Sequence, residues 1–224
     1  MKMPLFNHDE IFSAILERIC KNNKNRKHSE GEPDPKPELF SVEQMKLHGT
    51  MLAARHRLKS RTRPGIRCKL LIELARNEAI LLAAHRQLSA PIASARRRVP
   101  AVDWLLDNFY LLEENIHTTR RHFPASYHSE LPRLTDGENL DIPRVYALAA
   151  EAIVHGDGRL DMESLRALIG SYQETTALEL GELWAIPIML RLALIENIRR
   201  LTAILVANRI ARDLADVWAD RVME

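Results

Sequence analysis

Residues 176–212 read TALELGELWAIPIMLRLALIENIRRLTAILVANRIAR, the longest run of periodically spaced apolar residues in the chain. Thr176 and Glu179 have the spacing of a capping box, so we expect a helix to begin there. Pro187 lacks an N–H, which predicts a short helix over 178–186, a bend, and a longer helix from about Pro187. The stripe predicted to face the core is Leu190, Leu194, Ile195, Ile198, Leu201 and Leu205. Because charged residues interrupt every window of about 20 residues, we expect a core helix and not a membrane span.

The composition favours a helical protein with a sizeable core. The chain has 224 residues, of which 46% are hydrophobic and only 8 are glycine, and it shows little strand-like alternation. Cys20 and Cys68 have no paired spacing, which indicates a reducing compartment. Acidic residues interrupt the N-terminal segment, so it has no apolar signal core. We therefore expect an all-α protein in the cytoplasm.

The sequence predicts three parts. Residues 1–20 form an amphipathic helix with one apolar face, because Asn7 can cap it and apolar residues recur at helical spacing after it. Residues 21–38 hold three prolines and no large apolar residue, so they form a disordered linker. Residues 39–224 form the helical domain. The tethered helix is either a partner-binding segment or folds back onto this domain.

Within the domain, Ser41 and Gln44 form a capping box ahead of a first helix. The break at 63–65 and a second helix from Ile66 to about Leu88 predict an antiparallel helix pair.

A further helix is expected over 101–122 and a long loop over 123–142. Pro143 and Asp161 begin two more helices. The result is an all-α fold of about six or seven helices with no strand, in which the helices over 104–116 and 188–205 are central neighbours.

No pattern of catalytic, cofactor-binding or metal-binding residues emerges from the motifs. The stretch HGDGRLDMESL begins at His155 and has oxygen donors, but Met162 and Leu168 stand where a calcium loop needs glycine and glutamate. His117, His122 and His128 do not share a helical face. Phosphate-loop, nucleophile-elbow and sugar-nucleotide motifs are missing.

Charge is unevenly distributed along the chain. Residues 1–100 carry 20 Lys and Arg against 10 Asp and Glu, whereas residues 101–224 carry 12 against 20. One basic cluster consists of Arg55, Arg57, Lys59, Arg61, Arg63, Arg67 and Lys69. It could neutralise phosphates, but no aromatic residue between Phe40 and Trp104 is available for base stacking. We favour a solvated face or a docking surface for an acidic neighbour over a nucleic-acid site.

Three blocks of sequence carry a resemblance to a known family. They are WLLDNFYLLEENIHTTRRHFPASYHSELPRL (104–134), PRVYALAAEAIVHGDGRLD (143–161) and YQETTALELGELWAIPIMLRLALIENIRRL (172–201). In this order they resemble the N-terminal region of bacterial cyclic β-1,2-glucan synthases, over about residues 41–210. Members of that family are large inner-membrane glycosyltransferases that use UDP-glucose, with their catalytic domains and membrane spans downstream of this region. No catalytic residue is carried over, because those parts do not map onto this chain.

The resemblance implies a non-catalytic helical module of a cyclic β-1,2-glucan synthase, which supports or docks the glycosyltransferase at the cytoplasmic face. The chain would be a fragment, a truncated gene product or a free-standing relative, and its partner the remainder of a synthase or another protein. We expect Glu182, Trp184 and Arg191 to border an exposed groove used for docking, since Trp and Arg are favoured interface anchors. The alternatives are a basic nucleic-acid-binding or protein-interaction protein and a small autonomous enzyme.

Overall fold

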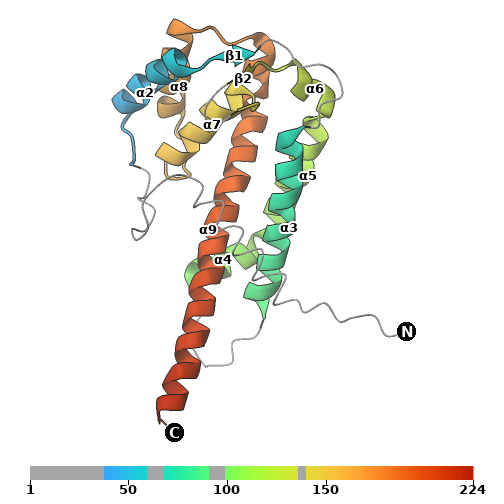
Figure 1. Ribbon diagram of the computed structural model, residues 1–224, viewed down its shortest axis with the longest axis vertical. Coiled ribbons are helices and arrows are strands. Elements are labelled where there is room, and N and C mark those ends of the chain that lie inside the picture. Colours follow the sequence, from blue (N-terminus) through green and yellow to red (C-terminus); the bar gives the residue numbers. More distant parts are fainter. Residues whose placement is uncertain (1–37, 60–67, 91–98, 136–139, 224) are drawn as a thin grey trace, which may run out of the picture. The chain divides into compact units, whose positions relative to one another are not determined.

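The computed structural model describes residues 38–59, 68–90, 99–135 and 140–223 (Figure 1). In chain order the elements are α2 (Val42–Arg55), β1 (Leu58–Lys59), α3 (Lys69–Ser89), α4 (Pro100–Asp107), α5 (Phe109–His122), α6 (Ala125–Glu130), β2 (Arg133–Leu134), α7 (Arg144–His155), α8 (Met162–Thr175) and α9 (Leu180–Met223). Helices make up 80% of the described residues, which confirms the all-α prediction. The helix predicted in residues 1–20 lies outside the described residues. The linker predicted over 21–38 also lies outside them, except for Glu38.

Helix α9 is continuous across Pro187, so the predicted division into two helices is wrong. A proline ring removes one backbone hydrogen bond from a helix. Here the side chains on either side of it, Ala185 and Met189, are fully buried, while Pro187 itself is exposed. We attribute the continuity to this burial, which holds both halves of the helix in place and offsets the single lost bond.

The buried face of α9 differs from the predicted stripe. Leu190 and Ile195 are buried as expected, but Leu201 is 52% exposed. Among the described elements, α7, α3 and α5 contact α9 most extensively, with α7 beside its N-terminal part and α3 beside its middle (Figure 1). Because the neighbours change along the helix, no single stripe faces the core over its whole length.

An arginine fixes α9 to the end of α3. Arg209 Nη1 donates to the carbonyl oxygens of Gln87 and Leu88 at 2.8 and 2.9 Å, and its Nη2 donates to that of Ala90 at 3.0 Å. The last carbonyls of a helix have no partner within the helix and attract positive charge. Arg209 therefore completes α3 from another element.

Helix α2 packs mainly on α8, and the predicted antiparallel pairing of α2 with α3 is wrong. The two helices touch closely at Gly49, where a Cβ would lie 2.4 Å from the Leu168 carbonyl oxygen. After α2, β1 pairs with β2 in an antiparallel two-stranded sheet, with Leu58 opposite Leu134. The prediction of no strand is therefore also wrong, although the sheet is small.

The segment predicted as one helix over 101–122 is divided into α4 and α5. At the junction, Asn108 Nδ2 donates to the carbonyl oxygen of Trp104 at 2.8 Å. Asn side chains compete with the backbone in this way, which makes them frequent at helix boundaries. On these two helices Leu112 is buried, but Trp104 is 63% exposed. Helix α5 contacts α9, as expected, although α7 and α3 contact α9 more extensively.

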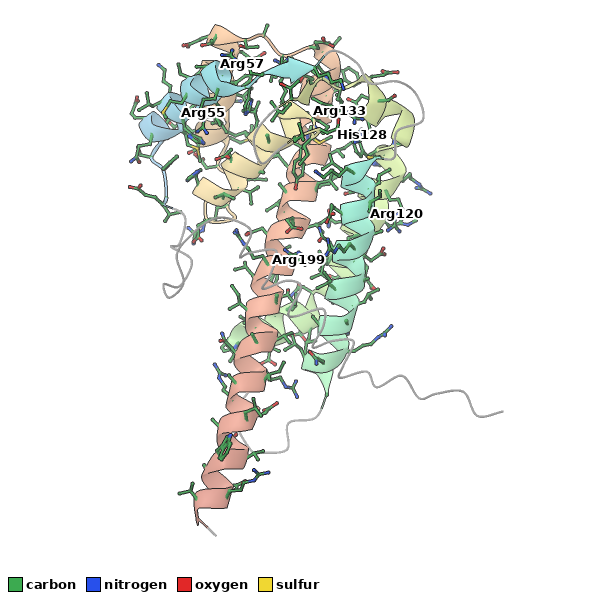
Figure 2. All side chains as sticks on the ribbon, in the orientation of Figure 1. Arg55, Arg57, Arg120, His128, Arg133 and Arg199 are labelled. Carbon is green, nitrogen blue, oxygen red and sulfur yellow. The ribbon has the colours of Figure 1, made fainter. Side chains whose placement is uncertain are left out.

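Residues 123–142 include α6 and β2, so they are not simply a loop. They also contain a buried charge: Arg133 donates to Asp141 Oδ1 at 3.1 Å and to His128 Nδ1 at 2.7 Å. Figure 2 shows Arg133 and His128 close to each other. Burial and the nearby Arg133 charge lower the pKa of His128 to about 4. His117 and His122 are exposed on α5, so these three histidines do not gather around one point.

The caps predicted at Ser41 and Asp161 are confirmed. Ser41 and Gln44 form both halves of a capping box, and the Asp161 side chain accepts from the Ser164 N–H at 2.8 Å. Asp157 and Gly158 adopt φ values of 52° and 73° in the turn before α8, a conformation that Asp and Gly tolerate in turns. Within the described ranges, none of the helices combines the length and apolarity that a membrane crossing requires.

Candidate interaction site on helix α9

The three predicted interaction residues all lie on α9 but in different environments. Trp184 is 74% exposed, Arg191 is half-buried and Glu182 is fully buried. Trp184 and Arg191 are seven residues apart, which places them on the same side of a helix two turns apart. Glu182 does not border an exposed surface, contrary to the expectation. Only Trp184 and Arg191 remain as candidates for docking.

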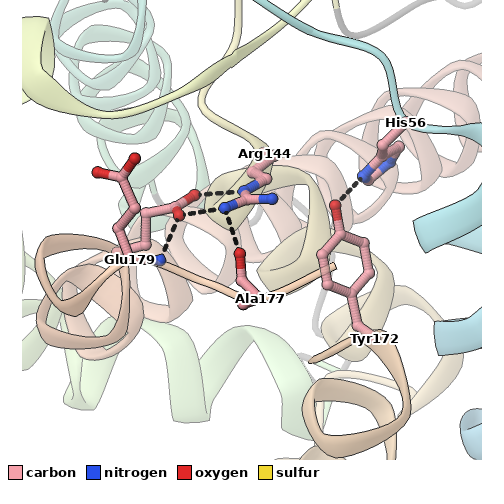
Figure 3. A network of polar contacts seen from close by, with 6 residues as sticks. His56, Arg144, Tyr172, Ala177 and Glu179 are labelled. Carbon is pink, nitrogen blue, oxygen red and sulfur yellow. Dashed lines mark hydrogen bonds and ion pairs between the residues drawn. The ribbon is translucent and has the colours of Figure 1, made fainter. Parts of the chain in front are cut away.

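Glu182 is instead the acceptor of a buried ion pair with Arg144, which is labelled in Figure 3. Arg144, the first residue of α7, donates from Nε to Glu182 Oε1 at 2.6 Å and from Nη2 to Oε2 at 2.5 Å. Its Nη2 also donates to the Ala177 carbonyl oxygen at 2.9 Å. Burial by itself lowers the pKa of the Arg144 guanidinium, but the hydrogen bonds and charge of Glu182 outweigh it and raise that pKa. The pair fixes the start of α7 to the start of α9.

The same carboxylate caps α9. Glu182 Oε2 accepts from the Glu179 backbone N–H at 2.8 Å, the bond that the third residue of a helix makes in a capping box. Thr176, which we predicted to begin this helix, is the C-cap of α8. The capping pattern is therefore displaced by three residues from the predicted one.

Tyr172 and His56 extend this network towards β1. The Arg144 guanidinium carbon lies 5.9 Å from the centre of the Tyr172 ring, and the Tyr172 hydroxyl lies 3.0 Å from His56 Nδ1. Burial raises the pKa of the Tyr172 hydroxyl. The network joins separate segments of the fold. Its charged groups are inaccessible to solutes, because Arg144, Glu182 and Tyr172 are all buried.

A small pocket nearby offers no chemistry of its own. Its lining is aliphatic and comes from α7, α8 and α9 and from the segment before α9: Val145, Leu148, Ala149, Leu165, Ile169, Leu178 and Ile186. An enzyme site needs polar groups that converge on a reacting atom. This pocket is part of the apolar packing between those elements.

The C-terminal part of α9 carries a second exposed feature, which we name the C-terminal stripe. It consists of Leu214, Val217, Trp218 and Val222, which are 48–82% exposed. The spacings of three, one and four residues place these side chains on one side of a helix. Figure 1 shows this part of α9 continuing past the end of α3. The predicted apolar run ends at Arg212 and so excludes this stripe, although the helical spacing is visible in the sequence.

Part of the basic cluster can also be placed. Arg55, Arg57, Lys59 and Lys69 are exposed, and Figure 2 shows Arg55 and Arg57 near the end of α2. Arg61, Arg63 and Arg67 lie outside the described residues. The described members face solvent, as a solvated or docking surface requires.

Comparison with known proteins gives one informative match. No family model matches the chain. Over 147 residues, 66% of its length, the chain is 37% identical to the cyclic beta-(1,2)-glucan synthase NdvB of Rhizobium meliloti (strain 1021). This chain matches a segment of a cyclic β-(1,2)-glucan synthase. The match confirms the resemblance seen in the three sequence blocks, and the matched residues span only 5% of the length of that synthase.

Proposed function

We propose that the chain is a non-catalytic helical module of the cyclic β-1,2-glucan synthase type, which docks against or supports the glycosyltransferase that polymerises glucose. The observation that carries this proposal is the 37% identity to a segment amounting to 5% of a synthase. A segment of that size accounts for a small part of the large enzyme. The buried position of Arg144 and Glu182 supports a structural role for the strongest polar network near the candidate site.

The docking surface in this proposal includes Trp184 and Arg191 on α9. Trp184 is 74% exposed, although large aromatic side chains in a folded domain usually have much of their surface buried. Trp and Arg are also enriched among the residues that dominate binding energies. The proposed partner is the remainder of the synthase, and the proposed location is the cytoplasmic face of the inner membrane.

The test uses a cyclic β-1,2-glucan synthase that carries residues 38–224 of this chain in place of its own corresponding segment. Replacing Trp184 and Arg191 together with alanine should lower glucan production in cells, while the purified module keeps its thermal unfolding temperature. The matched control is Trp104→Ala, because Trp104 is similarly exposed, at 63%, but lies on α4. Unchanged glucan production by the double variant, with normal stability, would rule out this surface.

The non-catalytic part of the proposal has its own measurement. The purified 224-residue chain should not transfer radiolabelled glucose from UDP-glucose to an acceptor. Transfer above the level of heat-denatured protein would contradict it.

The alternative of nucleic-acid binding rests on the exposed residues of the basic cluster, such as Arg55 and Arg57. Binding through phosphates weakens steeply as salt increases. A lack of measurable DNA or RNA binding at low ionic strength would remove this alternative.

A further inference from the structure

Three potential metal ligands from two distant parts of the sequence meet beside α7. His48 on α2 places Nε2 2.8 Å from Glu151 Oε2, and His155 places Nε2 3.3 Å from the same oxygen. Glu151 and His155 are four residues apart on α7, so they lie on one face of that helix. One ligand atom from each side chain lies within 4.8 Å of the other two. We call this group the His–Glu–His cluster.

The hydrogen bond of His155 determines which of its ring nitrogens is available. His155 Nδ1 lies 2.9 Å from the carbonyl oxygen of Glu38. A carbonyl oxygen can only accept, so Nδ1 carries the proton. In neutral His155 the lone pair of Nε2 then faces the cluster and the Glu151 carboxylate. Two electron-rich atoms at 3.3 Å favour a cation beside them.

The hydrogen bond from His155 Nδ1 to the Glu38 carbonyl oxygen is typical of histidines that bind a metal ion. Histidine ligands usually donate their second ring N–H to a backbone carbonyl or a carboxylate, which fixes the tautomer and the ring plane. Glu38 supplies that carbonyl for His155. The outer part of a metal site is therefore present along with the ligands.

Phe40 covers the cluster and holds its rings. Its ring stacks on His155, with centroids 3.8 Å apart and planes 6° apart, and meets His48 edge-on at 5.3 Å. The Phe40 N–H also donates to the His155 carbonyl oxygen at 3.1 Å. The His48, Glu151 and His155 side chains are 19%, 30% and 16% exposed, so an ion can enter yet would be partly shielded from water.

The position of His155 at the C-terminus of α7 also favours a bound cation. His155 is the last residue of α7, with Gly156 as the C-cap. The C-terminus of a helix carries partial negative charge and stabilises a cation. A metal ion held by His155 would lie next to this end of the helix.

We propose that His48, Glu151 and His155 bind a divalent transition-metal ion, with Zn²⁺ as the best fit. Two imidazoles and one carboxylate are a frequent zinc ligand set, whereas calcium and magnesium favour oxygen ligands throughout. With bonds of about 2.1 Å to zinc, ligand atoms of a tetrahedral site lie about 3.4 Å apart. The present spacings of 2.8 and 3.3 Å need only a small widening. The bound ion clamps α2 onto α7.

Sequence reasoning missed this cluster for a clear reason. His48 and Glu151 are 103 residues apart, so no short motif contains both. The only local signal is the spacing of Glu151 and His155, which is common in helices. The histidines that lie close together in the sequence, His117, His122 and His128, do not come together in the fold.

The test is metal binding by the full chain after treatment with EDTA. Isothermal titration with Zn²⁺ should show one site per chain, Co²⁺ should give a visible absorption band of tetrahedral type, and Zn²⁺ should raise the unfolding temperature. Removal of an outer-shell partner typically costs 10–100-fold in metal affinity, so His48→Ala, Glu151→Gln and His155→Ala should each weaken binding by at least about tenfold. His117→Ala, in an exposed histidine of α5, is the matched control and should bind as the unaltered chain does.

Three results would overturn the proposal. One is the absence of a stoichiometric zinc site in the unaltered chain. Another is equal binding by all the variants, which would assign the ion to other histidines. The third is an unfolding temperature that Zn²⁺ leaves unchanged in the EDTA-treated chain. Glu151→Gln preserves the size of the side chain, so its circular dichroism separates loss of a ligand from loss of the fold.

Discussion

The buried pair of Arg144 and Glu182 permits a quantitative test of the fold. The substitution Glu182→Gln keeps the size of the side chain and an acceptor for the Glu179 N–H, but removes the negative charge. Arg144 is 2% exposed and Glu182 is 0% exposed, so the guanidinium is left charged, buried and without its counter-ion. Breaking a buried pair from one side costs about 3–5 kcal/mol. For a chain of this size, 1 kcal/mol shifts the unfolding temperature by about 2–4 °C, so we expect a decrease of about 6–20 °C.

The diagnostic comparison is with the double variant Arg144→Met, Glu182→Gln. It removes both charges, so it should unfold at a higher temperature than Glu182→Gln alone even though it carries one more substitution. Glu179→Ala is the control, because that exposed side chain is removed while its backbone N–H remains. Differential scanning calorimetry measures all four proteins. A double variant that is as unstable as Glu182→Gln, or more so, would refute the unpaired-charge reasoning.

Two further predictions concern packing and pH. Gly49→Ala should destabilise the domain in thermal unfolding, because its Cβ would lie 2.4 Å from the Leu168 carbonyl oxygen. In the control Gly170→Ala, on the open side of α8, the added Cβ meets nothing within 4 Å. This control should be neutral or stabilising by up to about 1 kcal/mol. Equal effects of the two would contradict the close approach of α2 to α8. For His128, the folded-state pKa of about 4 lies below the ordinary value of 6.5, so the unfolded chain binds the proton more readily. Stability should be complete above about pH 6.5 and fall by up to about 3 kcal/mol as the pH decreases towards 4. Urea unfolding of the unaltered chain and of His128→Asn across this range measures the difference, and an unchanged slope in the variant would assign the loss to other groups.

Much of the local structure could be predicted from neighbouring residues. The caps at Ser41 and Asp161 are hydrogen bonds between residues three apart, so the sequence contains both partners within one turn. The division of α4 and α5 at Asn108 and the continuity of α9 through Pro187 were missed. In both cases the local preference is moderate, and at Pro187 we infer that the buried neighbours Ala185 and Met189 determine the outcome.

The sequence by itself determined the helical class of this protein, several helix starts and its match to a glucan synthase segment, because periodicity and local capping are contained in short stretches. Only the tertiary structure decided which side chains are covered and which distant ones meet. The sequence led us to expect Glu182 at an exposed groove, yet Arg144 from α7 makes it a buried counter-ion. His48 reaches Glu151 only because α2 packs away from α3. The physical reason is that burial and ligand geometry depend on which helices become neighbours, and the packing of the whole domain determines those neighbours.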